Sequence, residues 1–148
     1  MANPMYGQNK ADAHLDGQEK IVRVLINGGL AVTATTHAAG DHGFSWANPE
    51  GEDIMVTDFI LDITTEATGS ATMDIGVAAN GTTASDTLLD GVNVGAAAIL
   101  ASSDVSGGTN GLGAVKMSSS QYITADASAS VAGLVGSFYV KYFIISKA

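Results

Sequence analysis

The sequence predicts an all-β protein: one β-sandwich domain of the jelly-roll kind, preceded by a flexible N-terminal arm. Eighteen glycines, with abundant Ala, Ser and Thr, favour short strands joined by tight turns, because these residues tolerate turn geometry at low steric cost. Several apolar segments alternate with a period of two between such turns, and no segment sustains a helical period. The length of 148 residues suits one compact domain.

Residues 1–19 are predicted to form the arm and residues 20–148 the domain. Polar, small and charged residues follow one another in the arm without a clear period, and Pro4, Gly7 and Gly17 would interrupt a helix. Two interpretations stay open: a frayed terminus, and an arm that becomes ordered on a neighbouring subunit or on a shell. In the second case the residues expected to dock are Pro4, Met5, Tyr6, His14 and Leu15.

Three strands are expected in the first half of the domain. The first is 21–26, where β-branched residues precede an Asn-Gly-Gly turn. The second, 54–63, alternates clearly, and the third, 72–77, ends shortly before an Asn-Gly turn. One face of the second strand is predicted to carry Met55, Thr57, Phe59, Leu61 and Ile63. Residues 31–52 are predicted to be largely irregular, with a short strand candidate at 32–35.

The second half of the domain gives shorter strand signals. Ser85 is placed to cap one helical turn that runs to Leu89, ahead of an Ala-rich apolar segment at 92–100. A glycine-rich loop then precedes strand candidates at 112–117 and 121–125. The pattern of short strands between turns is that of a sandwich rather than of an α/β fold.

The longest apolar segment, 131–145, is apolar on both faces of the strand that it predicts. The inward face is expected to carry Leu134, Phe138, Val140, Tyr142 and Ile144. The opposite face must be covered either by loops of this chain or by another subunit, because neither face looks suited to water. If another subunit covers it, the residues of the oligomer interface are Val135, Tyr139, Phe143 and Ile145.

The formal net charge of −9 is unevenly distributed along the chain. No Lys or Arg occurs between Arg23 and Lys116, whereas eleven of the fifteen acidic residues do. Nucleic-acid binding needs clustered cations that neutralise phosphates, and anionic lipid headgroups make the same demand. The charge pattern therefore predicts no nucleic-acid partner and no membrane partner. Any partner surface is expected to be neutral or basic.

The chain has no cysteine, which excludes disulfides, thiolate metal sites and cysteine nucleophiles. No apolar run is long enough to span a bilayer. The first residues lack the apolar core of a secretory signal, so synthesis in a cytoplasm is expected.

Two polar clusters could carry chemistry, and each fits a plainer role better. His37, Asp41 and His42 combine groups that bind metals or move protons, but their spacing is not diagnostic and a glycine-rich loop is expected to be polar. Asp86 and Asp90, with an Asn three residues on, offer oxygen ligands. They lack the alternating positions and closing Glu of a calcium loop, so turn formation and capping explain them better.

The glycine-rich stretch 107–113 lacks both the spacing of a dinucleotide-binding loop and the lysine of a phosphate-binding loop. A serine nucleophile in the usual elbow spacing is also absent from the sequence. The sequence therefore predicts a protein that is not an enzyme and that has no metal site and no cofactor.

Four segments resemble parts of small virion proteins of tailed phages. The segments 67–78 and 88–95 run Ala-Thr-Gly-Ser-Ala-Thr-Met-Asp-Ile-Gly-Val-Ala and Leu-Leu-Asp-Gly-Val-Asn-Val-Gly. The segments 121–125, Gln-Tyr-Ile-Thr-Ala, and 132–140, Ala-Gly-Leu-Val-Gly-Ser-Phe-Tyr-Val, are similar to the terminal strands of such proteins. The resemblance spans residues 54–145, is carried by composition, and contains no catalytic signature.

This resemblance implies a capsid decoration protein, also called a cement protein, of a phage head. The expected partners are the major capsid protein and further copies of the chain, with a trimer favoured and the N-terminal arm docking on the shell. The implied location is the outer capsid surface of the virion, after synthesis in the host cytoplasm. Many weak contacts repeated over a lattice would stabilise the shell without any single tight site.

A second function stays open, that of a carbohydrate-binding β-sandwich module of a phage tail or spike. Trp46 and Tyr122 would then form a platform on which a sugar ring stacks. Glycan binding that requires Trp46 would favour this alternative, whereas binding to intact shells that requires residues 1–19 would favour decoration.

Overall fold

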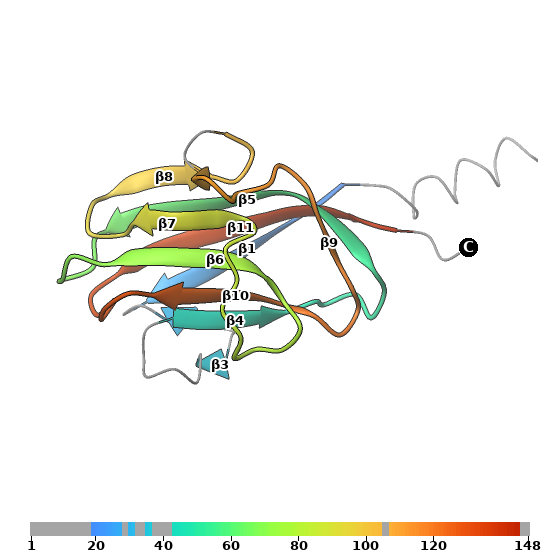
Figure 1. Cartoon of the computed structure of the whole chain (residues 1–148), viewed down its shortest axis with the longest axis horizontal. Coiled ribbons are helices and arrows are strands. Elements are labelled where there is room, and N and C mark those ends of the chain that lie inside the picture. Colours follow the sequence, from blue (N-terminus) through green and yellow to red (C-terminus); the bar gives the residue numbers. More distant parts are fainter. Residues whose placement is uncertain (1–18, 28–29, 32–34, 37–42, 105–106, 146–148) are drawn as a thin grey trace, which may run out of the picture.

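Two antiparallel sheets pack against each other across an apolar core (Figure 1). The computed structural model describes residues 19–27, 30–31, 35–36, 43–104 and 107–145. Within those residues the chain is all-β and forms a single domain, which confirms the predicted β-sandwich. The predicted arm lies outside them except for Glu19.

Among the described residues, one sheet has six strands and the other has five. The six-stranded sheet has the order β2 (Leu30–Ala31), β1 (Lys20–Asn27), β11 (Val135–Ile144), β5 (Ile54–Thr65) and β8 (Ala98–Ala101), with β9 (Val115–Met117) also paired to β5. The five-stranded sheet has the order β3 (Thr35–Thr36), β4 (Gly43–Ala47), β10 (Tyr122–Ala127), β6 (Thr72–Ala78) and β7 (Leu89–Asn93). Because β1 pairs with β11 along its whole length, the first and last of these strands lie side by side.

The core is built around Phe138 of β11. Phe44 from the facing sheet and Phe59 from the neighbouring strand both stack on its ring, with centroids 5.0 and 5.2 Å away. Trp46 meets the same ring edge-on at 6.4 Å. The three phenylalanines have no exposed surface, and burial of each contributes roughly 1.5–3 kcal/mol. These contacts join the two sheets and fix which face of β11 turns inward.

Strand β5 contains an irregularity that changes which residues face the core. Its core-facing residues are Ile54, Val56, Phe59, Leu61 and Ile63. The alternation slips by one between Val56 and Phe59, because the pairing with β11 leaves Thr57 as an extra residue, a β-bulge. The prediction that Met55 and Thr57 share a face with Phe59, Leu61 and Ile63 is therefore wrong, and both side chains are half-buried. The predicted inward positions from Phe59 onward are confirmed.

Other elements match their predictions to different degrees. Strands β1, β6 and β10 confirm the strands predicted from 21, 72 and 121, each within a few residues. The segment around Trp46 forms β4 instead of irregular structure, because it pairs with β10. No helical turn runs to Leu89, since Leu88 N–H donates to the Ile75 carbonyl at 2.9 Å and the chain enters β7. The strand candidate at 32–35 lies outside the described residues except for Thr35 in β3.

Candidate interaction surface

The face of the six-stranded sheet that points away from the core carries most of the exposed large apolar side chains. Of the described chain, the exposed large apolar residues are Ile21, Leu25, Ile99, Leu112 and Val135. All except Leu112 lie on strands of this sheet. We call this surface the outer face, and it consists of Ile21, Arg23, Leu25, Asp58, Ile60, Asp62, Ile99, Val135, Ser137, Tyr139, Lys141 and Phe143. Clustered exposed apolar side chains of this kind mark interaction sites.

Strand register arranges the outer face in rows that cross the sheet. One row runs from Leu25 through Ser137 and Asp62 to Ile99. The next row runs from Arg23 through Tyr139 and Ile60 to Ala101. In these two rows the exposed apolar residues, Leu25 and Ile99, stand on the rim strands β1 and β8, whereas Tyr139 and Ile60 in the middle are half-buried.

Three of the four residues predicted for an oligomer interface lie together on the outer face. Val135, Tyr139 and Phe143 project from β11, the first exposed and the other two half-buried. Ile145 follows the strand, and its N–H donates to the Asp53 carbonyl at 2.8 Å. The inward prediction for this strand is confirmed, since Leu134, Phe138, Val140 and Tyr142 are buried and Ile144 packs against the core. The role of the outward residues in an oligomer stays a prediction.

Arg23 contacts two residues of β11 on the outer face. Its Nε donates to Ser137 Oγ at 3.1 Å, and its guanidinium carbon lies 6.0 Å from the centre of the Tyr139 ring. Both distances are within the usual range for a hydrogen bond and a cation–π contact. These contacts hold the guanidinium group over the sheet.

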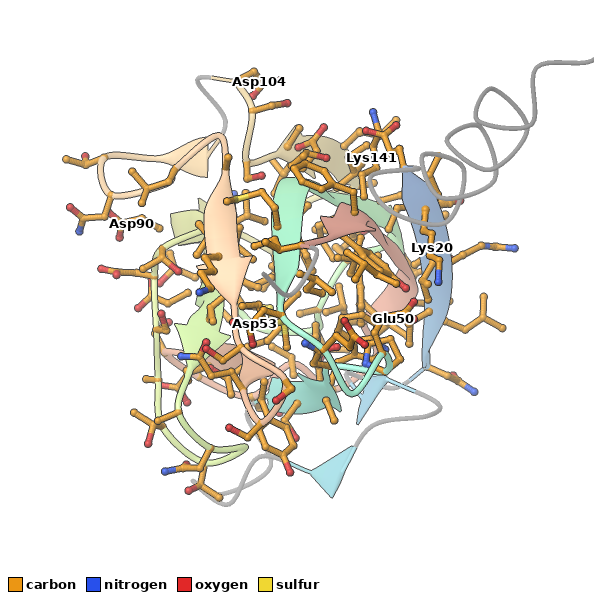
Figure 2. All side chains as sticks on the ribbon, turned by 90° about the vertical axis from the view of Figure 1, so that its right-hand side faces the viewer. Lys20, Glu50, Asp53, Asp90, Asp104 and Lys141 are labelled. Carbon is orange, nitrogen blue, oxygen red and sulfur yellow. The ribbon has the colours of Figure 1, made fainter. Side chains whose placement is uncertain are left out.

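Lys20, Glu50 and Tyr142 form a hydrogen-bonded group at the start of β1, and Figure 2 shows Lys20 and Glu50 on that side of the molecule. Lys20 Nζ and Tyr142 OH both donate to Glu50 Oε1, each at 2.7 Å. The hydrogen bond from Lys20, followed by that from Tyr142, lowers the pKa of Glu50. Burial, followed by the hydrogen bond to Glu50, raises the pKa of Tyr142. Tyr142 thus keeps its proton at neutral pH, and the group ties three segments together.

The oxygen ligands considered for calcium are used within turns and loops. Asp86 Oδ2 accepts a hydrogen bond from Asn110 Nδ2 at 2.9 Å, and Asp90 Oδ2 accepts one from Asn110 N–H at 3.1 Å. Asn93 Oδ1 accepts one from Gly95 N–H at 2.8 Å. The glycine-rich loop is thereby tied to Asp86, which precedes β7, and to Asp90, which lies within it. These contacts agree with the predicted turn roles of the side chains.

A shallow hollow near these turns is lined by Asp74, Ala84, Ser85 and Asp86. Within the described residues, no group of three or more His, Asp and Glu side chains could hold a metal ion. The same part of the chain has no helix long and apolar enough to cross a membrane. Two predicted sets lie outside the described residues: His37, Asp41 and His42, and the docking residues Pro4, Met5, Tyr6, His14 and Leu15.

The two residues of the alternative sugar platform lie on opposite faces of the five-stranded sheet. Trp46 opposes the fully buried Ile123 and is itself only 7% exposed. Tyr122 precedes Ile123 and therefore points to the other face. An indole ring that is buried in the core offers no face to a sugar, so Trp46 and Tyr122 do not form this platform.

The sequence-based prediction missed the exposed residues of the two rim strands. On β1 a usable signal exists, because Val24 and Ile26 face the core while the alternate positions Ile21 and Leu25 are also apolar. Ile99 stands in an Ala-rich segment whose pairing with β5 only the structure shows.

No protein-family model matches the chain, and no curated protein sequence matches it. Among solved structures, the fold is similar to that of a chain in a structure described as the capsid of Ralstonia phage GP4. The TM-score is 0.55 with 14% sequence identity, and the match covers 90% of this chain and 88% of that chain. At this identity the likeness shows a common fold, and the chain has the β-sandwich fold of a chain from a phage capsid structure.

Proposed function

We propose that this chain is a structural virion protein that decorates the outer surface of a phage head and stabilises the shell without catalysis. The observation that carries the proposal is the fold shared with a chain of a phage capsid structure. The coverages of 90% and 88% are nearly equal, so the two chains have similar lengths. The likeness therefore concerns most of each chain. The resemblance of the segments within 54–145 to small phage virion proteins supports the same function.

The outer face supports the self-association that the proposal includes. Val135, Tyr139 and Phe143 present apolar surface on the central strand β11. Because the last two are already half-buried, their full burial under a neighbouring copy would contribute on the order of 1 kcal/mol each. A symmetric oligomer buries this surface in every subunit, and a trimer is the proposed assembly.

The proposed contact with the shell is made by residues 1–19. The net charge of −9 makes a neutral or basic region of the major capsid protein the expected docking site. Binding to the assembled shell stabilises it by mass action, and an oligomer that holds several shell subunits at once adds avidity.

Shells that lack this protein provide the direct test. The purified chain is mixed with such heads, the heads are sedimented, and bound chain is counted against the major shell subunit by quantitative mass spectrometry. We expect saturation near one copy per shell subunit, together with a higher temperature of shell disruption. Saturation at a handful of copies would place the protein at a vertex, tail or spike instead, and no binding would contradict a virion role.

A further inference from the structure

Ile21, Arg23 and Leu25 project from β1 at every second position and form a patch at the rim of the six-stranded sheet. Ile21 is 61% and Leu25 48% exposed. Among the described residues, β1 pairs with β11 on one side and with β2 only at Ile26 and Asn27 on the other. The patch therefore lies where a neighbouring molecule can reach both the strand and its outward side chains.

Arg23 differs from the other described cations in its partner. The three described lysines pair with carboxylates: Lys20 with Glu50 at 2.7 Å, Lys116 with Asp53 at 3.0 Å and Lys141 with Glu19 at 3.7 Å. Within the same residues, Arg23 contacts a hydroxyl and an aromatic ring instead. Its Nε is engaged with Ser137, so its terminal amino groups can bind a carboxylate from another molecule. An arginine held on a tyrosine and flanked by apolar side chains is a typical interface hot spot.

The β8 side of the same sheet carries the complementary chemistry, with Ile99 on the rim strand β8 and Asp62 on β5, the next strand inward. Ile99 on β8 is 71% exposed, the highest value among the large apolar side chains of the described chain. Asp62 of β5 is its register partner on the outer face, so a carboxylate stands beside the exposed isoleucine. Leu25 and Ile99 end the same row, three strand spacings or roughly 14 Å apart, so the two rims cannot meet within one chain.

We propose that a second copy of the chain docks its β8 rim on the β1 patch. Arg23 binds the Asp62 carboxylate of the neighbouring copy, and Ile99 of that copy packs against Leu25 and covers Tyr139. The contact is head-to-tail: one copy uses its β1 patch and the other its β8 side, so each pair keeps one β1 patch and one β8 side free for further copies. This inference rests on the proposed self-association and specifies its geometry.

Charge decides between this contact and a two-fold contact between two β1 strands. A two-fold axis beside β1 would bring Lys20 and Arg23 close to their own copies, and like charges across an interface are unfavourable. The β8 side of the sheet instead offers the Asp62 carboxylate beside the exposed Ile99. A head-to-tail contact closes into a ring when the rotation between neighbours divides a full turn, which suits the proposed trimer.

Molecular mass in solution tests the chemistry of the contact. Light scattering is expected to give an oligomer for the wild-type chain and the mass of one 14.9 kDa chain for Arg23→Glu and for Ile99→Asp. Leu112→Asp is the matched control, since Leu112 is also exposed but is on no strand of this sheet, and it should keep the oligomer. The double variant Arg23→Glu, Asp62→Lys restores opposite charges and should regain the oligomer. An unchanged mass for Arg23→Glu, or a monomeric wild type, would overturn the inference.

Cross-linking tests which two rims meet and does not depend on how charge reversal affects folding. The chain has no cysteine, so Leu25→Cys and Ile99→Cys each introduce a single thiol. With a short bis-maleimide, the mixture of the two variants should give cross-linked pairs and neither variant alone should. Cross-linking of Leu25→Cys alone would replace the head-to-tail contact by a two-fold contact, and no cross-link in the mixture would reject it. Shell binding is measured separately, so a failed contact and a failed virion role give different results.

Discussion

Glu50 is the residue whose charge is most closely tied to the fold. One oxygen accepts hydrogen bonds from both Lys20 and Tyr142, and the side chain is only 18% exposed. The pKa of Glu50 is lowered in the folded chain, first by Lys20 and then by Tyr142. A lowered pKa contributes stability above the unfolded-state pKa, and that stability is lost as the pH falls through the folded-state pKa.

Glu50→Gln is therefore expected to lower the free energy of unfolding by about 1–2 kcal/mol near neutral pH, because two charge-assisted hydrogen bonds become weaker neutral ones. The loss should shrink as the pH falls below about 4, because the carboxyl of the unfolded wild-type chain becomes protonated there and the carboxyl of the folded chain follows at lower pH. Urea unfolding at a series of pH values measures both effects. Glu52→Gln removes a carboxylate from the same turn and is the control. An equal loss at acidic and neutral pH would show that the effect does not come from the charge.

Among the elements, alternation predicted the two faces of a strand correctly where that strand contains no extra residue. The inward and outward faces of β11 follow from its sequence because the alternation there is unbroken from Leu134 to Ile144. On β5 the bulge at Thr57 reverses the faces, and threonine fits either face, so nothing in the local sequence marks the slip. Strand β4 depends on its pairing with β10, a tertiary contact that outweighs weak local preference.

The outer face was predictable only in part, because its composition depends on which strands pair with one another. Apolar residues on both sides of the last strand indicated a covered surface, and the structure places Val135, Tyr139 and Phe143 on one face. The rim positions of Leu25 and Ile99 depend on strand order, which arises from pairing between segments far apart in the sequence. Local patterns in a single sequence do not specify that order.

Gly136 marks a second irregularity, where β11 and β5 change register next to Val135. A Cβ atom at this position would overlap the carbonyl oxygen of Asp62 on the neighbouring strand. Gly136→Ala is expected to lower the free energy of unfolding by about 2 kcal/mol or more, because the central strand pair must separate. Gly113→Ala, where a Cβ would meet open space, should change stability little. Equal urea midpoints for the two variants would contradict a close approach at Gly136.

The whole domain is closed by the pairing of its first and last long strands. Lys20 and Glu19 secure the start of β1 through ion pairs with Glu50 and Lys141. Pairing of β1 with β11 joins segments more than a hundred residues apart, which makes the fold depend on both of its ends.

Removal of residues 1–18 tests whether folding of the sandwich and docking on the shell depend on different residues. The shortened chain is expected to keep the unfolding free energy of the full chain within about 0.5 kcal/mol, because Glu19 and Lys20 remain. It should keep the oligomer as well, since the proposed contact uses β1, β5 and β8, but it should no longer sediment with shells. A longer deletion that also removes Glu19 and Lys20 is the comparison, and it should lose stability through Glu50. Full shell binding by the chain without residues 1–18 would assign docking to the sandwich itself, and the outer face would then be a candidate for contact with the shell rather than with another copy.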